Sequence, residues 1–250
     1  MEIIFRFFKF IFAVITGTIF ILTFFIFVPC YFIVFTFYPK ETAPHKAHKL
    51  SQLWAKTLFT VFFIRTKIKN SELIDPSQTY VFIANHQSFL DIPAYAIACN
   101  NSIRFLAKVE LTKIPLLGYV IRKIYITVDR KDKAARLKSI ENMLDSLREE
   151  ISVFICPEGT RNRTEKPLLD FHDGAFRLAI ESQLPLAVLT VKGAEKLLSP
   201  LRPLELSPGT ITCVWAKPIA TSGMNIDDLP RLKEEARNLM LAILDESGNG

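Results

Sequence analysis

Residues 80–99 read Tyr-Val-Phe-Ile-Ala-Asn-His-Gln-Ser-Phe-Leu-Asp-Ile-Pro-Ala-Tyr-Ala-Ile-Ala-Cys, an apolar run, a polar segment and a second apolar stretch. The first five residues form a short run of aromatic and β-branched type, which predicts a buried strand. Residues 91–99 predict a helix, because Pro93 falls in its first turn, where proline is tolerated. A strand that leads through a polar turn into a helix is the repeating unit of an α/β domain.

The same alternation continues along the chain. Apolar runs predict further strands at residues 103–107, 124–128, 152–156, 186–191 and 211–215, and helical periods predict helices at 116–123, 133–150, 174–182 and 228–245. The chain has no internal repeat and no long linker, so residues 72–250 are expected to form one domain. The expected fold class is α/β, with a largely parallel sheet flanked by helices.

Residues 1–40 are a different kind of sequence. Twelve of the 21 phenylalanines lie here, and no charged residue occurs between Phe10 and Pro39. The run exceeds the roughly 20 apolar residues that a bilayer-spanning helix needs, and it exceeds the apolar part of a signal peptide. We expect an N-terminal apolar, membrane-anchoring helical segment. Pro29 divides it, which leaves two alternatives: a single span, or a re-entrant hairpin that turns at Pro29.

Residues 41–71 have an amphipathic pattern. Leu50, Trp54 and Leu58 recur at helical spacing, whereas Lys49 and Lys56 lie off that stripe. The segment is expected to be a juxtamembrane amphipathic helix, and two interpretations stay open. Its apolar stripe packs on the domain core, or it lies at headgroup depth with Trp54 as an anchor.

Basic residues flank the apolar segment on both sides. Arg6 and Lys9 precede it, and Lys40 and Lys46 follow it. By the charge rule both flanks face the cytoplasm, which favours the re-entrant alternative. The expected location is the inner (cytoplasmic) membrane, with the domain facing the cytoplasm. The whole chain has 31 Lys and Arg against 25 Asp and Glu, a net charge of +6. In a membrane-attached chain, we expect this excess to face an anionic membrane surface or to attract an anionic substrate.

Several classes of protein are excluded. The sequence has no zinc finger, heptad run or aromatic-basic motif, so no nucleic-acid partner is expected. The four cysteines are far apart and form no C-x-x-C pair, which is typical of reduced thiols and not of a metal site. No metal ligand set is predicted.

The first candidate for chemistry follows the strand at 80–84. His86 precedes Asp91 by five residues, so the carboxylate can meet the imidazole across one turn. An Asp in that place fixes the imidazole tautomer and stabilises its protonated form, which makes the other ring nitrogen a competent general base. A helix-capping Asp91 beside a partly buried His86 would give the same spacing, and this second interpretation stays open.

The second candidate follows the strand at 152–156. Gly159 lets the backbone approach a ligand, Thr160 offers a hydroxyl, and Arg161 presents a planar fork that suits a phosphate. An ordinary ion pair between Glu158 and Arg161 in a turn is the alternative. Because open α/β sheets bind ligands at the carboxyl ends of their strands, both candidates are expected at one edge of the sheet.

These residues carry a resemblance to a known family. Asn85-His86-x4-Asp91, Asp129-Arg130, the segment Pro157 to Arg161, and Pro185 resemble, in this order, the four motifs of the phospholipid/glycerol acyltransferase family. The resemblance covers residues 75–220. It is most similar to the pattern of bacterial members that act on 1-acyl-sn-glycerol 3-phosphate.

The resemblance implies an enzyme that moves a fatty acyl group from a thioester to the sn-2 hydroxyl of 1-acyl-glycerol 3-phosphate, giving phosphatidic acid. His86 would be the general base and Asp91 would orient it. The acceptor phosphate would be held by Glu158, Gly159, Thr160, Arg161, Arg130 and Lys108. The resemblance implies no metal and no cofactor, with acyl-CoA or acyl-acyl carrier protein as co-substrate and a membrane lipid as acceptor.

Two alternatives remain beside this function. The acceptor could differ, glycerol 3-phosphate or a lysolipid such as lyso-ornithine lipid, because His172-Asp173 stands where the family usually has Lys-x. The chain could also be a non-catalytic lipid-binding protein that keeps the fold. A serine hydrolase is excluded, because the Gly-x-Ser-x-Gly turn that carries its nucleophile is absent.

Overall fold

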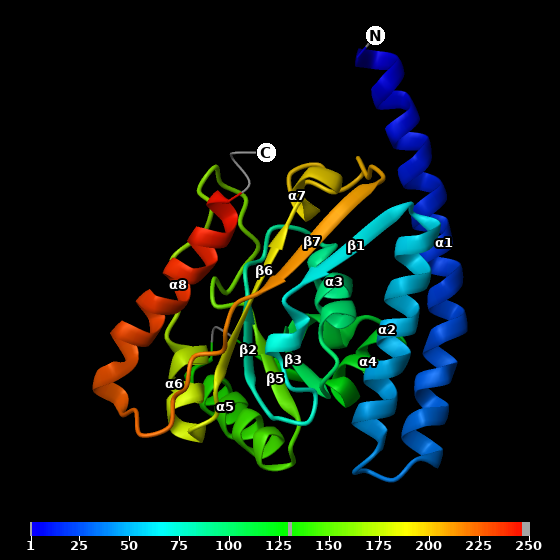
Figure 1. The fold of residues 1–250 in the computed structure, drawn as a ribbon. Coiled ribbons are helices and arrows are strands. Elements are labelled where there is room, and N and C mark those ends of the chain that lie inside the picture. Colours follow the sequence, from blue (N-terminus) through cyan, green and yellow to red (C-terminus); the bar gives the residue numbers. More distant parts are fainter. Residues whose placement is uncertain (1, 130–131, 247–250) are drawn as a thin grey trace.

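The computed structural model describes residues 2–129 and 132–246. At its centre lies a seven-stranded sheet with the strand order β1-β7-β6-β2-β5-β3-β4 (Figure 1). The strands are β1 Ile64–Lys69, β2 Val81–Ala84, β3 Ile103–Lys108, β4 Tyr125–Val128, β5 Ser152–Ile155, β6 Leu186–Lys192 and β7 Gly209–Trp215. Neighbouring strands are parallel except β6 and β7, which are antiparallel. The predicted α/β fold with a largely parallel sheet is confirmed.

Strand β1 corrects one expectation. The range 41–71 was expected to be a single amphipathic helix, but helix α2 (Ala43–Val61) ends early and β1 joins the edge of the sheet beside β7. Phe63 adopts a positive φ of 53°, which breaks the helix and turns the chain into the strand. The sheet domain therefore begins near residue 64, before the expected boundary at 72.

Helices cover both faces of the sheet (Figure 1). The remaining helices are α1 Glu2–Phe37, α3 Asp91–Ala98, α4 Leu117–Ile124, α5 Lys133–Arg148, α6 Gly174–Ser182, α7 Ala194–Leu197 and α8 Leu229–Asp245, with 3₁₀ turns η1 Ser71–Leu73, η2 Val109–Lys113 and η3 Ile226–Asp228. Successive side chains of a strand point to opposite faces. Phe82 accordingly packs with Trp215 in the core under α2 and α3, whereas Val81 and Ile83 pack in the core under α6 and α8.

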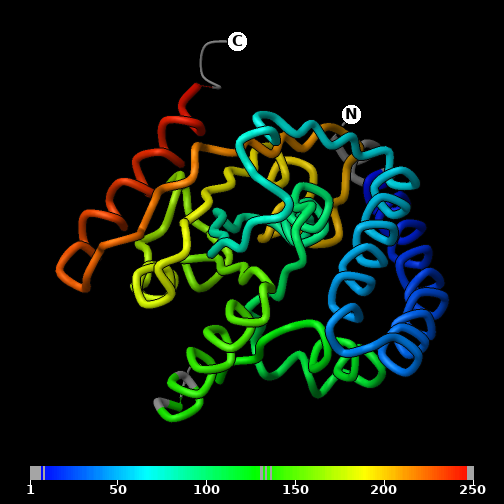
Figure 2. The backbone as a smooth tube through the Cα atoms, turned by 60° about the horizontal axis from the view of Figure 1, so that its bottom comes forward, coloured from blue at the N-terminus to red at the C-terminus, as the bar shows by residue number. Residues whose placement is uncertain are grey.

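Helix α1 continues through Pro29 without a break. The chain does not reverse at this proline but at residues 38–42, and α2 then runs back alongside α1 (Figures 1 and 2). The hydroxyl of Tyr31 shares a hydrogen bond of 2.7 Å with Ser51 of α2, and Phe32 stacks on Tyr119 of α4 with ring centroids 4.0 Å apart. The apolar N-terminal segment is therefore one arm of a helical hairpin that is packed against the domain.

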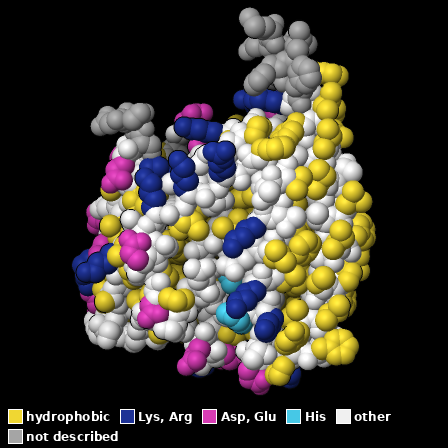
Figure 3. All heavy atoms as spheres, turned by 45° about the vertical axis from the view of Figure 1, so that its right-hand side comes forward, with side chains coloured by type: hydrophobic (Ala, Val, Ile, Leu, Met, Phe, Trp, Pro, Cys, Tyr) yellow, Lys and Arg dark blue, Asp and Glu magenta, His cyan; other side chains and the backbone are white. Residues whose placement is uncertain are grey.

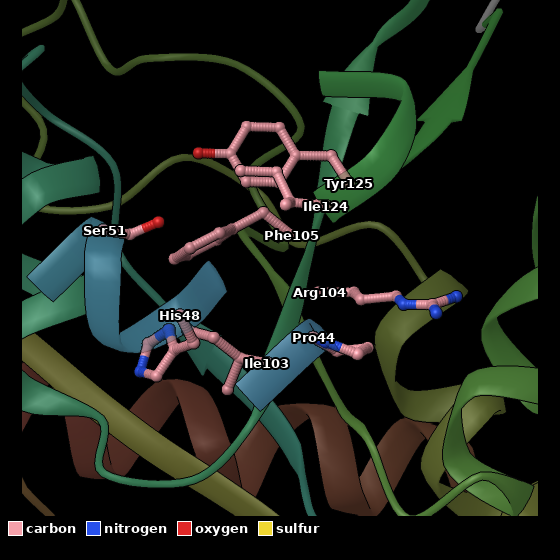
Figure 4. Close-up of a pocket in the computed structure, with 8 residues that line it drawn as sticks. All are labelled: Pro44, His48, Ser51, Ile103, Arg104, Phe105, Ile124 and Tyr125. Atoms are coloured by element: carbon pink, nitrogen blue, oxygen red, sulfur yellow. The ribbon is translucent and has the colours of Figure 1, made fainter. Parts of the chain in front are cut away.

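Helix α2 is fixed to the sheet domain by polar contacts. His48 and Gln52 both bond the carbonyl oxygen of Cys99, at 2.8 Å and 2.7 Å, and His45 bonds Ser102 at 3.0 Å. A small cavity remains between α2 and the strands β3 and β4 (Figure 4). Its walls are formed by Pro44, His48, Ser51, Ile103, Arg104, Phe105, Ile124 and Tyr125. None of these eight residues belongs to the predicted site.

Candidate active site

His86 and Asp91 form the pair that their spacing predicts. The imidazole Nδ1 lies 2.9 Å from Asp91 Oδ2. His86 follows the end of β2 and Asp91 is the first residue of α3, so the strand-to-helix turn brings the two side chains together. The Asp91 side chain is 2% exposed and that of His86 is 17% exposed. With Nδ1 held by the carboxylate, Nε2 is the nitrogen left to exchange a proton with a substrate.

The Asp91 carboxylate is held in place by the backbone of the same turn. Its Oδ2 also accepts hydrogen bonds from the backbone N–H groups of Gln87 at 2.6 Å and Ser88 at 2.7 Å. Three donors on one oxygen therefore hold the carboxylate in place, and its contact with Nδ1 fixes the orientation of the imidazole.

Glu158 lies directly beneath this pair. Its Oε1 accepts from the backbone N–H of His86 at 2.8 Å, and its Oε2 accepts from the backbone N–H of Leu169 at 2.8 Å. The residue is 2% exposed, and this burial raises the pKa of its carboxyl group. The expectation that Glu158 holds a phosphate is therefore corrected, because the carboxylate points inward and both oxygens are taken by the backbone.

Arg161 is half-buried and stacks on a residue of the catalytic turn. Its guanidinium carbon lies 3.4 Å from the centre of the Phe89 ring, a cation–π contact. One terminal nitrogen, Nη1, is buried and has no hydrogen-bond partner among the described residues. Burial lowers the pKa of Arg161, with the nearby Arg163 acting in the same direction. A guanidinium that is stacked in place with a free donor is ready to bind an anion.

The turn around Arg161 is shaped by residues on either side of it. Gly159 has a φ of +68°, a backbone conformation that favours glycine, and Thr160 is exposed next to it. The backbone N–H of Asn162 donates to the carbonyl of His86 at 2.7 Å, which links this turn directly to the catalytic candidate. The Asn162 side chain also accepts from the N–H of Thr164 at 2.9 Å. Asn162 was not among the residues expected at the site, although asparagine side chains commonly bond the backbone two residues on in a turn.

Two predicted residues lie away from this centre. Lys108 ends β3, which is separated from β2 by one strand, so it lies about 10 Å along the same edge of the sheet. Its Nζ pairs with Glu110 at 3.1 Å, and its side chain is 57% exposed. Arg130 lies outside the described residues. The structure thus brings His86, Asp91 and Arg161 together and leaves Lys108 at the periphery.

A second layer of polar contacts joins β2 to β6 behind the site. The Asn85 amide donates to the carbonyl of Val191 and accepts from its N–H, both at 2.8 Å. The hydroxyl of Tyr95 donates to the carbonyl of Asn85. Each of these groups is buried, so their bonds hold the end of β2, and with it His86, at a fixed depth.

The arrangement can perform general base catalysis next to an anion-binding group. The described part of the chain holds no cluster of three His, Cys, Asp or Glu side chains that suits a metal ion. A base oriented by a buried carboxylate can deprotonate a hydroxyl that is placed near Nε2. A negatively charged group on the same substrate would meet Arg161.

Comparison with known proteins identifies the family of the chain. The Acyltransferase family matches residues 65–192, more than half of the chain, and this range contains every residue of the candidate site. The chain therefore belongs to the acyltransferase family.

Within this family, the chain is similar to proteins named as 1-acyl-sn-glycerol-3-phosphate acyltransferases. The chain is 30% identical over 203 residues to the mouse 1-acyl-sn-glycerol-3-phosphate acyltransferase alpha, covering 80% of this chain and 70% of that protein. It is 29% identical to the chloroplastic 1-acyl-sn-glycerol-3-phosphate acyltransferase BAT2 of Brassica napus, covering 76% of this chain and 54% of that one. The fold is that of the 1-acyl-sn-glycerophosphate (LPA) acyltransferase PlsC from Thermotoga maritima, with a TM-score of 0.80, 23% identity and coverage of 100% and 99%.

Proposed function

We propose that this chain transfers a fatty acyl group from a thioester to the sn-2 hydroxyl of 1-acyl-glycerol 3-phosphate, forming phosphatidic acid. The observation that carries the proposal is the contact between His86 and Asp91, which lies beside the partnerless guanidinium nitrogen of Arg161. Two relatives that cover most of this chain are named for the same reaction. A base at His86 and an anion-binding group at Arg161 together suit a substrate that carries both a hydroxyl and a phosphate.

The reaction follows from the position of His86. Its Nε2 takes the proton of the acceptor hydroxyl as the oxygen attacks the thioester carbonyl, and the imidazolium that forms is stabilised by Asp91. When the tetrahedral intermediate collapses, the thiolate leaves and receives that proton from His86. The new ester and a free thiol are the products. General base catalysis of this kind contributes roughly 10²–10⁴ in rate.

The acceptor phosphate is assigned to Arg161, with the backbone of Gly159 and the hydroxyl of Thr160 beside it. The guanidinium already lies against the Phe89 ring, so little side-chain entropy is lost when the anion binds. Glu158 acts as a positioning residue, because its carboxylate contacts the backbone of His86 and not the substrate. Lys108 contributes at longer range, and Arg130 keeps its expected role as a second cation.

The membrane location is carried by the α1–α2 hairpin. Residues Lys9–Phe37 form a helix long and apolar enough to cross a membrane, and only 11% of its most apolar window is buried. Figure 3 shows a band of hydrophobic side chains along this side of the molecule. A spanning helix would have to leave the protein surface, but α1 is held along α2 and α4. We place α1 in one leaflet of the cytoplasmic membrane, with the domain on the cytoplasmic side.

The donor is a thioester of a soluble carrier, coenzyme A or acyl carrier protein, and the chemistry needs no cofactor. The test supplies purified protein in detergent with labelled acyl-CoA or labelled acyl-acyl carrier protein. Three acceptors are compared: lysophosphatidic acid, glycerol 3-phosphate and a lysolipid without a phosphate. Labelled phosphatidic acid is expected from the first acceptor, and the His86→Ala variant should form none.

The same assay separates the other functions. If the acyl group is transferred to glycerol 3-phosphate or to the phosphate-free lysolipid and not to lysophosphatidic acid, the acceptor is reassigned. The acyl-transfer reaction itself is then retained. If no acceptor is acylated with either donor while a control acyltransferase is active, the enzyme assignment fails. Lysolipid binding by such an inactive chain, measured by calorimetry, would then identify a lipid-binding protein.

A further inference from the structure

Two leucines are exposed on a loop at the active-site end of the domain. The loop, residues 198–208, connects α7 to β7 and contains the sequence Ser-Pro-Leu-Arg-Pro-Leu-Glu at residues 199–205. Leu201 is 65% exposed and Leu204 is 64% exposed. A single exposed leucine needs no explanation, but two on one short loop form an apolar tip, and contiguous exposed apolar surface marks interaction sites.

The loop is ordered by its own hydrogen bonds. The N–H of Arg202 donates to the carbonyl of Ser199, and the N–H of Glu205 donates to the carbonyl of Arg202, both at 3.1 Å. The side chains of Arg202 and Glu205 form an ion pair at 3.1 Å, and the N–H of Ser207 closes the base on the carbonyl of Leu197. The two leucines are therefore presented on a preformed turn, which lowers the entropy cost of binding.

The base of the loop is joined to the catalytic turn. The hydroxyl of Ser88 donates to the carbonyl of Leu198 at 2.8 Å. The backbone N–H of the same Ser88 donates to Asp91. Ser88 thus connects the His86–Asp91 turn to the base of the loop, so the loop lies close to the candidate site.

The loop also lies beside the N-terminal half of α1. Figures 1 and 2 both place the segment that follows α7 next to that helix. Phe12, Ala13 and Ile19 of α1 pack against the core cluster that includes Leu197 and Leu206, at the two ends of the loop. On the outer side of the same part of α1, large apolar side chains face solvent, namely Phe7, Phe10, Val14 and Ile15.

We propose that Leu201 and Leu204 insert into the same membrane leaflet as α1 and form a second membrane contact. This inference rests on the membrane location assigned to α1 under the proposed function. Its support is the position of the loop beside the N-terminal half of α1, where large apolar side chains of the helix are also exposed. The two contacts then hold the mouth of the site at headgroup height, where a lipid acceptor resides.

The insertion can be measured without activity. A Leu201→Trp variant of the full chain is mixed with phosphatidylethanolamine and phosphatidylglycerol vesicles that contain lipids brominated on their acyl chains. The native Trp54 and Trp215 are present in every variant, so the wild-type signal is subtracted. The added fluorescence of Leu201→Trp should be quenched. A Leu137→Trp variant is the matched control, because Leu137 is 56% exposed on α5 and should show no quenching.

Kinetics provide the second readout. A Leu201→Ser/Leu204→Ser double variant should raise the apparent KM for long-chain lysophosphatidic acid in vesicles by roughly tenfold, because less apolar surface enters the bilayer. With a short-chain, water-soluble lysophosphatidic acid, the kcat and KM of the double variant should match those of wild type. The control variant Leu137→Ser should match wild type with both acceptors.

The possible failures are distinguishable. If Leu201→Trp is not quenched, or if the double variant matches wild type on vesicles, the loop does not contact the membrane, and the proposed function stands unchanged. Fluorescence that is shielded without vesicles in a concentration-dependent way would assign the loop to a contact between two copies of the chain and overturn the inference. An inactive wild-type protein would contradict the proposed function, while the quenching measurement would still decide the membrane contact.

Discussion

The carboxylate of Glu158 accepts a hydrogen bond of 2.8 Å from the backbone N–H of His86. The segment of residues 157–161 is thereby bonded directly to the segment that contains His86 and Asp91. The second oxygen of Glu158 holds Leu169, at the far end of the segment that follows Arg161. Because both oxygens of the buried Glu158 carboxylate accept hydrogen bonds from backbone N–H groups, Glu158 fixes the position of the His86 backbone relative to the turn that contains Arg161. Glu158 therefore contacts the backbone of the site, and neither of its oxygens is left for a ligand.

Replacement of Glu158 by Gln should change the pH dependence of stability. Burial raises the pKa of the folded carboxyl group above its unfolded value of about 4.5, so the folded state binds the proton more tightly. The contribution of Glu158 to the unfolding free energy is therefore full below pH 4.5 and is lost as the pH rises through the folded pKa. Urea unfolding in detergent, from pH 4 to 7, should show the wild type losing stability relative to Glu158→Gln.

An unfolding free energy of Glu158→Gln that runs parallel to wild type over this pH range would mean that the carboxyl group keeps its ordinary pKa in the folded protein. Because Gln has one oxygen and cannot accept from both N–H groups, kcat should also fall while the KM for acceptor stays near wild type.

Asp91→Asn should show how much the negative charge of Asp91 contributes to kcat, apart from its hydrogen bonds to the turn and to His86. A single oxygen, Oδ2, takes all three hydrogen bonds in the native turn, so the amide oxygen of Asn can occupy the same place. The neutral side chain no longer stabilises the imidazolium, and kcat should fall by about 10²-fold or more. Steady-state kinetics and a melting curve check this, and a kcat within tenfold of wild type would remove the charge of Asp91 from the mechanism.

Substitution of Arg161 should act on binding of the phosphate. Hydrogen bonds to charged groups are worth about 1.5–3 kcal/mol, so Arg161→Ala should raise the KM for lysophosphatidic acid by roughly 10- to 100-fold. Arg161→Lys keeps the charge but loses the planar contact with Phe89, and an intermediate KM is expected. A phosphate-free lysolipid is the control acceptor, and an equal loss on both acceptors would show that Arg161 does not bind the phosphate.

Gly118→Ala should destabilise the connection between η2 and α4. A Cβ at Gly118 would lie 2.0 Å from the carbonyl oxygen of Thr112, so the backbone of one segment must move. Overpacking of this kind costs about 1–3 kcal/mol. Gly174→Ala is the matched control, because a Cβ there meets nothing within 4 Å. Thermal unfolding should show a lower Tm only for Gly118→Ala.

Local patterns were sufficient for much of the fold and part of the site. Each of the strands expected between residues 80 and 215 is present, because apolar runs bounded by polar turns are a local signal. The contact of His86 with Asp91 follows from their spacing across one strand-to-helix turn. Strand β1 was missed because it lies at the sheet edge, where exposed Arg65, Lys67 and Lys69 dilute the apolar pattern.

The role of Glu158 was beyond the reach of sequence. The motif that contains it predicts a site for an anion, but only the packing of β5 beside β2 puts its carboxylate under the backbone of His86. The same packing leaves one nitrogen of Arg161 without a partner and places Lys108 at the periphery. These are long-range relationships, and local spacing contains no information about them.

The amino-acid sequence by itself determined the α/β class, the apolar N-terminal helix and the contact between His86 and Asp91, because each depends on residues close together in the chain. Only the tertiary structure decided that α1 passes through Pro29 and pairs with α2, that β1 belongs to the sheet, and that Glu158 supports His86. The physical reason is the same in each case. Burial and hydrogen bonding between distant segments determine which polar groups face inward and which remain free for a substrate.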